Sequence, residues 1–425
     1  MPDGTASAHL YRPKLATVIA EGYGLEAFRK DCIAGLTVAI VALPLSMAIA
    51  VASGVGPERG LYTAIIGGFL VSALGGSRYQ IGGPAGAFIV VVSATVAQFG
   101  LSGLLLTVLL SGAMLTLIGA LRLGALIRYM PHAVTVGFTC AIAMTILASQ
   151  LKDLGGLTLP HEPDHFFPKL VAIGKALPSI TPSALALGVG CAAIIFALRR
   201  WRPNWPGMLI AVALGSVAAF VFQLPVETVG SRFGGIPNTL PAPELPAISL
   251  AAVWKVLPAA ITFTLLGGVE SLLSAKVADG MTGRKHRYNM ELVAQGIANM
   301  ASALFGGISV TGTIARTATN IRAGARSPLS GMMHAGFLLV FMLIAAPLAS
   351  YIPLSVLGGV LVVVAWNMAE IKEFASLFRH WRTAVILAAT FGLTLLQDLT
   401  LGIVAGCVLA ALFALMEWVK GRYAG

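Results

Sequence analysis

The stretch Gly306-Gly-Ile-Ser-Val-Thr-Gly-Thr-Ile-Ala-Arg316 places an arginine behind a run of small residues, with apolar sequence on both sides. An arginine at membrane depth costs several kcal/mol on most scales, so it is rare unless it faces a partner or a wet cavity. Glycine weakens a helix by about 1 kcal/mol per residue. Gly306, Gly307 and Gly312 therefore disfavour helix ahead of Thr313, and the segment predicts a membrane span that is broken and polar at its centre.

The composition of the whole chain is that of an integral membrane protein. Of its 425 residues, 57% are hydrophobic and 11% are charged, whereas soluble domains carry about 25% charged residues. The net charge of +11 comes from short basic clusters between apolar runs, which is typical of cytoplasmic loops and not of a nucleic-acid surface. We expect a multi-pass protein of the bacterial cytoplasmic membrane, in contact with the lipid bilayer and with no nucleic-acid partner.

The apolar runs predict an all-α fold of fourteen spans in two inverted repeats of seven. The spans lie at about 32–53, 60–75, 81–98, 103–121, 132–150, 182–198, 206–223, 251–275, 291–305, 308–323, 329–349, 353–368, 383–397 and 400–418. An odd number of spans per half gives the halves opposite orientations, as in many secondary transporters. The even total places both termini on the basic, cytoplasmic side.

These spans divide the chain into five parts. We expect a polar cytoplasmic tail at 1–27, a first repeat at 28–225, an extracytoplasmic linker at 226–250, a second repeat at 251–418 and a cytoplasmic end at 419–425. The two longest connections, about 151–181 and 224–250, are expected to be non-helical and to lie on the outer side.

The third span of each half is interrupted in the same way. The first half contains Ile81-Gly-Gly-Pro-Ala-Gly-Ala-Phe88, and an offset of 224 residues aligns Gly82 with Gly306. Because proline lacks an N–H and suits the first turn of a helix, Pro84 predicts a helix that begins near the bilayer centre. Paired interruptions of this kind are the best sequence sign of a transporter's binding site.

Two helix N-termini aimed at one point form an anion site, because each offers unpaired N–H groups and about half a positive charge. Arg316 adds a full charge, and small residues let an ion approach the backbone; these are Ala85, Gly86, Ala87, Gly312 and Thr313. Ser309, Thr311 and Thr313 are further hydrogen-bond candidates. The same glycines also fit close helix packing in lipid. The alternative that they serve packing, and not anion binding, therefore stays open.

Glu270 is the second charge inside a predicted span. A buried carboxylate there can carry a coupling proton, or it can help to bind sodium together with Ser274, one turn away on the same face. The alternative is a structural ion pair between Glu270 and Arg316.

Other candidates are weaker. Four cysteines (Cys32, Cys140, Cys191 and Cys407) are read as packing residues, and His161 and His165 form a poor metal pair because Pro163 interrupts them. The stretch 368–382 has the mixed pattern of an interfacial helix. Motifs of ATP-driven pumps and membrane hydrolases are missing, so we expect no enzyme activity, no metal site and no cofactor.

Four stretches resemble the SulP family of sulfate and anion permeases: SRYQIGGPAGAF (77–88), ESLLSAKVADGMTGRKHRYNMELVAQGIANM (270–300), GGISVTGTIARTATNIRAGARSPLSG (306–331) and VLVVVAWNMAEIKEF (360–374). The resemblance implies a core and a gate domain, an elevator-type movement between them and a homodimer. It implies anion binding by Ala85, Gly86, Ala87 and Phe88 in the third span and by Gly312, Thr313, Ile314 and Arg316 in the tenth. In the eighth span, Glu270 and Ser274 take the positions of an aspartate and a threonine in bicarbonate-transporting relatives, where the aspartate binds sodium.

The chain also departs from these relatives. Glu270 replaces their aspartate and Ile314 replaces a hydroxylated residue, which favours coupling to H⁺ over Na⁺. Most family members continue into a cytoplasmic STAS domain, and the sequence contains none after the last span. We expect a secondary active transporter of a small anion (sulfate, a dicarboxylate such as fumarate, or bicarbonate) that works by H⁺ symport. The alternatives are a Na⁺-coupled bicarbonate symporter and an uncoupled anion exchanger or channel.

Overall fold

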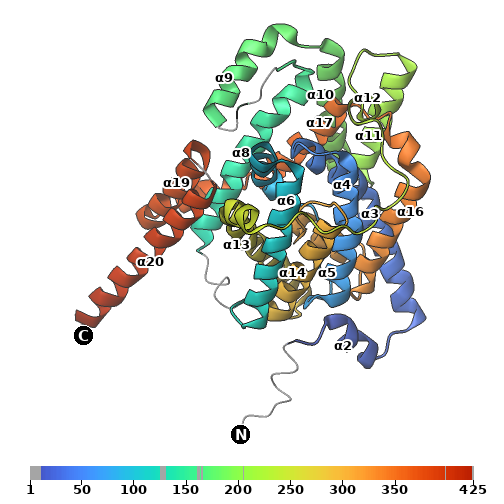
Figure 1. Ribbon diagram of the computed structural model, residues 1–425. Coiled ribbons are helices and arrows are strands. Elements are labelled where there is room, and N and C mark those ends of the chain that lie inside the picture. The colour runs from blue at the N-terminus through green and yellow to red at the C-terminus, as the bar shows by residue number, and fades with distance from the viewer. Residues whose placement is uncertain are drawn as a thin grey trace.

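A computed structural model describes residues 11–124, 131–159, 163, 166–203, 205–397 and 399–423. Within these ranges the chain is almost wholly helical (Figure 1). His161 and His165, which were rejected above as a metal pair, lie outside the described residues. Among those that are described, no group of three or more His, Cys, Asp or Glu residues could hold a metal ion, and all four cysteines are free thiols.

The helices and strands lie on both sides of an irregular connection between residues 233 and 250. Up to residue 233 these are α2 Lys14–Glu21, α3 Leu25–Ala52, α4 Pro57–Tyr62, the π-helix η1 Thr63–Gly67, α5 Gly68–Leu74, β1 Gly82–Gly83, the 3₁₀ turn η2 Gly86–Phe88, α6 Ile89–Ala120, α8 His132–Gly155, α9 Phe166–Ala176, η3 Leu177–Ser179, α10 Pro182–Trp201, α11 Gly207–Val221 and α12 Val229–Phe233. From residue 250 they are α13 Leu250–Thr282, α14 Tyr288–Leu304, β2 Thr311–Gly312, α15 Ile314–Arg322, α16 Leu329–Ala349, α17 Leu354–Met368, α18 Ile371–Leu377, α19 Trp381–Leu396 and α20 Leu399–Tyr423.

Seven helical segments of the described chain are long and apolar enough to cross a membrane. They are Leu25–Ala52, Gly86–Ala120, His132–Gly155, Pro182–Trp201, Leu250–Thr282, Leu329–Ala349 and Leu354–Leu377. Shorter apolar helices occupy Gly207–Val221, Trp381–Leu396 and Leu401–Met416. The total of fourteen spans stays a prediction.

The helices pack into two groups. The first group consists of α3, α4, α5, α6, α13, α14, α15 and α16, with α6 against α14 and α3 against α16 as its main contacts. The second group consists of α8, α10, α11, α17, α19 and α20, with α17 held between α8 and α10. Contacts between α17 and α3, and between α11 and α3, join the groups. Any relative movement of the two groups would have to slide these helices past one another.

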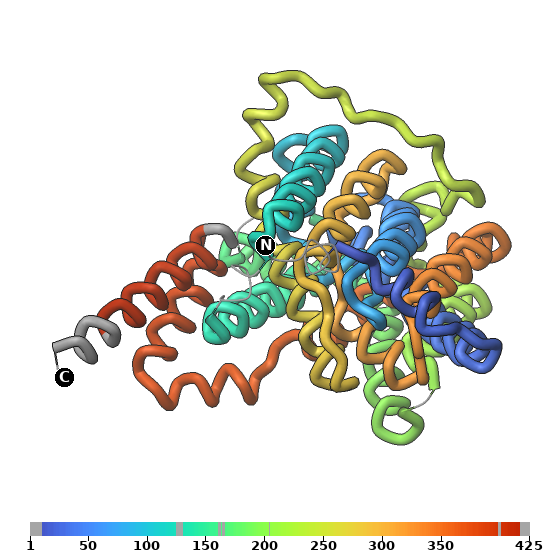
Figure 2. The backbone as a smooth tube through the Cα atoms, turned by 90° about the horizontal axis from the view of Figure 1, so that it is seen from below, coloured from blue at the N-terminus to red at the C-terminus, as the bar shows by residue number. Residues whose placement is uncertain are grey.

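The two ends of the molecule are distinguished by the helices that lie there, α2 at one end and α9 and α12 at the other. In Figure 1 the N-terminal helix α2 lies below the bundle, α9 and α12 lie at its upper end, and α19 and α20 project to one side. Figure 2 shows the connection between α12 and α13 arching across the helices. That connection is irregular from residue 234 to residue 249.

Residues 151–181 contain α9 and 224–250 contain α12, so the expectation that these two connections are non-helical is wrong. Helix α2 lies within the predicted tail 1–27. The predicted break between the spans at 81–98 and 103–121 is present, because two helices meet at Gly100, where the backbone is not helical (φ 67°, ψ −174°). Only glycine adopts such a backbone without strain, and this accounts for the kink at that residue. The interfacial stretch 368–382 forms only the short helix α18.

Candidate functional site

Two extended segments pair inside the first helix group. Strand β1 runs antiparallel to β2, with Gly82 opposite Gly312 and Gly83 opposite Thr311. The offset of 224 residues between Gly82 and Gly306 compares places in the two halves of the chain and is not a strand register, so it stays a prediction. Helical structure begins at Gly86 on one chain segment and at Ile314 on the other. Both half-helices thus start within a few residues of the strand pair, as the broken spans predicted.

The start of α15 is open to its surroundings. Thr313 caps the helix in an extended conformation, and its backbone N–H donates to the Ile81 carbonyl at 3.0 Å. Ile314 and Ala315 follow it and are exposed, Ile314 by 37%. The N–H groups of a helix's first turn have no partner within the helix. This terminus can therefore present donors and partial positive charge to a ligand.

The start of the other half-helix lies against the second helix group. Ala85, Gly86, Ala87 and Phe88 are all buried. A Cβ added at Gly86 would lie 3.0 Å from the Met368 sulfur of α17, and Phe88 packs edge-on against Phe263 of α13, with ring centroids 5.4 Å apart. This helix end therefore sits at the boundary between the two helix groups.

Arg316 is buried beside the strand pair. The side chain is 2% exposed, and its Nη2 donates to the Ser46 hydroxyl of α3 at 3.2 Å. Its Nε and Nη1 have no hydrogen-bond partner among the described residues. A Cβ on Gly83 would lie 2.2 Å from Nη1, so the guanidinium is packed closely against the backbone of β1. A buried cation with unused donors is poised to hold an anion or ordered water.

Glu270 does not pair with Arg316. It is partly buried and lines a cavity of about 10 Å³ with α8 residues such as Thr135 and Phe138 and with Ile403 of α20. Within the part of the chain that the structure describes, no ion pair joins it to another residue. The alternative of a Glu270–Arg316 ion pair is therefore wrong, and the carboxylate faces the second helix group instead.

Ser274 faces a different helix from Glu270. Its hydroxyl donates to the Thr317 hydroxyl of α15 at 3.1 Å and is fully buried. Glu270 lines a cavity with residues of α8 and α20, whereas Ser274 is bonded to α15. A shared ion site of the two residues stays a prediction.

The hydroxyls ahead of Arg316 bind the protein itself. Ser309 donates to the Asn299 amide oxygen at 3.2 Å, Thr311 lies 3.0 Å from the Ser271 hydroxyl, and Thr313 donates to the Ile81 carbonyl at 3.2 Å. Gly312 is equally constrained, because an added Cβ would lie 1.8 Å from the Gln80 amide nitrogen. Close packing therefore accounts for Gly312, and the open N-terminus of α15 is what supports the anion reading.

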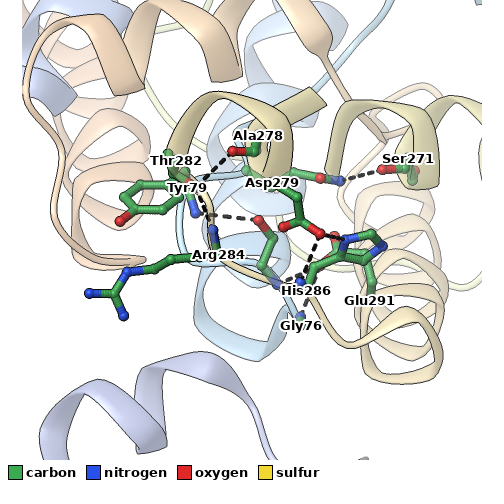
Figure 3. A network of polar contacts seen from close by, with 11 residues as sticks. Gly76, Tyr79, Ser271, Ala278, Asp279, Thr282, Arg284, His286 and Glu291 are labelled. Carbon is green, nitrogen blue, oxygen red and sulfur yellow. Dashed lines mark hydrogen bonds and ion pairs between the residues drawn. The ribbon is translucent and has the colours of Figure 1, made fainter. Parts of the chain in front are cut away.

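Several buried residues near this site were not predicted from the sequence. His334 of α16 is fully buried, and both its ring nitrogens lack a partner among the described residues. Glu291 of α14 accepts the N–H groups of Gly76 and Ser77 at 2.8 and 2.9 Å and so holds the chain leading to β1. Figure 3 shows Glu291 beside Gly76, with Asp279 beside His286. The sequence did carry a signal for both residues, because His334 and Glu291 are polar side chains inside predicted spans.

Comparisons with known proteins agree with this architecture. Residues 28–417 match the sulfate permease family. YvdB of Bacillus subtilis, described as a candidate sulfate transporter, is 46% identical over 92% of this chain and 74% of its own. The bicarbonate transporter BicA of Picosynechococcus is 34% identical over 90% of this chain and 69% of its own. The solved transmembrane domain of a cyanobacterial BicA superposes with a TM-score of 0.81 at 30% identity, over 90% of this chain and 98% of that one.

Proposed function

The chain belongs to the sulfate permease family, and on that premise we propose that it is a secondary active transporter that moves a small anion in symport with H⁺. It is a multi-pass membrane protein with the fold of that family, and a transporter, not an enzyme. The single observation that carries the proposal is the meeting of two half-helix N-termini at the β1–β2 pair, with Arg316 buried beside them. Such a site attracts any small oxyanion.

The two helix groups support an elevator-type mechanism. The first group holds the strand pair and would act as the moving core, and the second would act as the gate. The anion would bind to Ala85, Gly86, Ala87 and Phe88 on one side and to Thr313, Ile314 and Arg316 on the other. We further propose two inverted repeats of seven spans (28–225 and 251–418), both termini in the cytoplasm, and a homodimer.

Glu270 is the proposed coupling residue. It lines a cavity together with residues of α8 and α20 in the second helix group, so its surroundings change if the groups move. A carboxylate at such a boundary can take up a proton in one position and release it in the other. Sodium needs several oxygen ligands around one point, and the Ser274 hydroxyl is already bonded to Thr317. Coupling to H⁺ is therefore favoured over Na⁺.

The test is uptake into proteoliposomes of labelled sulfate, bicarbonate and fumarate under an inward proton or sodium gradient. We expect a proton gradient alone to drive accumulation of at least one anion. Arg316→Ala should weaken anion binding at least about tenfold, or about 1.4 kcal/mol. Glu270→Gln should abolish accumulation and leave anion exchange, whereas the control Glu244→Gln, an exposed carboxylate in the linker, should change neither. Accumulation driven by sodium alone would overturn the choice of coupling ion.

A further inference from the structure

Strand β2 has an outer edge that β1 does not cover. Along an antiparallel pair, successive residues point their N–H and C=O groups alternately toward the partner strand and away from it. The Thr313 N–H donates to the Ile81 carbonyl of the opposite segment, so Gly312 and Val310 point their backbone groups away from β1. A backbone group without a partner is costly inside a membrane protein, and this edge therefore needs partners from the surrounding helices.

Two buried side chains supply these partners. The Gly312 N–H donates to the Ser271 hydroxyl of α13 at 3.2 Å. The side-chain amide of Asn299, on α14, pairs with both backbone groups of Val310, because its Oδ1 accepts the N–H at 2.9 Å and its Nδ2 donates to the carbonyl at 2.8 Å. Asn299 thus takes the place of a neighbouring strand at this residue.

Every hydrogen-bonding position of the Asn299 amide is used. An asparagine side chain has an oxygen that can accept twice and a nitrogen that can donate twice. Besides the pair with Val310, Oδ1 accepts the Ser309 hydroxyl at 3.2 Å, and Nδ2 donates to the Gln295 carbonyl, one turn earlier on α14, at 2.8 Å. The side chain is buried. The amide is therefore fixed in orientation, and an apolar or shorter side chain cannot make the same contacts.

Helix α14 binds the approaches to both strands with one face. Glu291 accepts the N–H of Gly76 ahead of β1, and the Ser302 hydroxyl donates to the Ile308 carbonyl ahead of β2 at 2.7 Å. Side chains three or four residues apart lie on the same side of a helix, which places Asn299 on this face too. The strand pair is thus attached to α14 at several points along its length.

The segment that Asn299 binds leads directly into the helix-end site. Val310 is followed by β2, by the cap residue Thr313 and by the open first turn of α15. Arg316 lies in that turn, and among the described residues its guanidinium has one hydrogen-bond partner, the Ser46 hydroxyl. The charge therefore follows the backbone of α15, which begins shortly after Val310.

We propose that Asn299 is a positioning residue for anion binding. Its amide fixes Val310, and through β2 it fixes the N-terminus of α15 and the guanidinium of Arg316 at the site. The inference rests on the proposed transport function and adds to it a residue that acts on the anion site through the backbone, without touching the anion.

The test is a titration of the purified protein with labelled sulfate, or with labelled bicarbonate if sulfate does not bind. Asn299→Leu keeps the approximate size of the side chain and removes its hydrogen bonds, so it should raise Kd about tenfold. Asn299→Ser leaves room for a water molecule that bonds to Val310 without fixing it, so it should fold normally and raise Kd about three- to tenfold. The number of binding sites per protein should stay unchanged in both variants.

The number of sites and Kd separate positioning from folding. A misfolded fraction lowers the number of sites and leaves the Kd of the remaining protein unchanged, whereas a displaced helix end raises Kd at a full number of sites. Thr264→Val is the matched control. Its hydroxyl is buried in the same helix group and donates to the Ser111 hydroxyl at 3.2 Å and to the Ala260 carbonyl at 2.7 Å, both outside the two extended segments. This variant should keep the Kd of the unsubstituted chain.

Three results would overturn the inference. An unchanged Kd in the Asn299 variants, or fewer sites with an unchanged Kd, would refute the positioning role and leave the proposed function intact. If Asn299→Leu does not fold, Asn299→Ser alone decides. Absence of sulfate and bicarbonate binding by the unsubstituted chain would refute the proposed function, and the positioning role with it.

Discussion

Arg316 depends on the absence of a side chain at Gly83. The guanidinium fills the space that a Cβ at Gly83 would need, 2.2 Å from Nη1 and 3.4 Å from Cζ. Because Arg316 is itself buried and close-packed, it cannot move aside without cost. The position of the site's one full positive charge is thus set by a glycine in the opposite half of the chain.

Gly83→Ala is therefore expected to weaken anion binding in the same direction as Arg316→Ala, but by less, about three- to tenfold or roughly 1 kcal/mol. The measurement is an anion titration of the purified protein. In the Arg316→Ala background the glycine substitution should have little further effect, since the group that it displaces is gone. Gly336→Ala in α16, where an added Cβ meets nothing, is the control. Full additivity of the two substitutions would show that Gly83 acts independently of Arg316.

At the scale of elements, the sequence predicted what depends on local composition. Glycines ahead of Thr313 and the proline at 84 indicated half-helices, and the structure starts them at Ile314 and Gly86. Features that depend on which elements pack next to each other could not be predicted from local sequence. The direction of Glu270 depends on which helices surround α13, and the partner of Gly82 depends on the sense of strand pairing. Helix α9 was missed because its buried stripe of three residues is far shorter than a span.

The N-terminal helix α2 is held to the first helix group by a half-buried ion pair and a few hydrogen bonds. Glu21 pairs with Arg78, and the Lys14 N–H donates to the Gly75 carbonyl at 2.9 Å. The hydrogen bond from Arg78 lowers the pKa of Glu21. A carboxyl with a lowered pKa in the folded state contributes stability above its ordinary pKa of about 4.3, and that contribution is lost as pH falls through the lowered value.

Glu21→Gln should therefore loosen α2 at pH 7. We expect faster hydrogen–deuterium exchange in residues 14–21 of the variant than of the unsubstituted chain at the same pH. The difference should shrink as the pH falls through the lowered pKa of Glu21, where the native carboxyl also becomes neutral. Glu26→Gln, which removes an exposed partner of Lys30 on α3, serves as the control. A difference that persists unchanged at low pH would mean that the charge of Glu21 does not hold the helix.

At the scale of the whole molecule, the two helix groups place the proposed binding and coupling residues on one boundary. The helix end at Gly86 faces Met368 of α17, and Glu270 faces α8 and α20. The helix end and the carboxylate therefore belong to the first helix group and face the second. Sliding of one group against the other would change the surroundings of the anion and of the carboxylate in a single step, which is what coupled transport requires.

A cross-link across this boundary should stop transport. Leu273 of α13 and Val134 of α8 line the same cavity of about 10 Å³, which makes this pair the place to introduce a bond across the boundary. With the four native cysteines replaced by serine, Leu273→Cys paired with Val134→Cys should lose at least about 90% of its uptake rate on oxidation, equivalent to more than 1.4 kcal/mol in the barrier, and recover it on reduction. Leu115→Cys paired with Leu272→Cys joins α6 and α13 inside the first group, where both residues share one apolar cluster. That pair should transport equally well in both states, because a core that moves as one body does not strain a bond within itself. Full uptake by the cross-linked boundary pair would exclude any mechanism in which α13 moves past α8, and with it the proposed elevator.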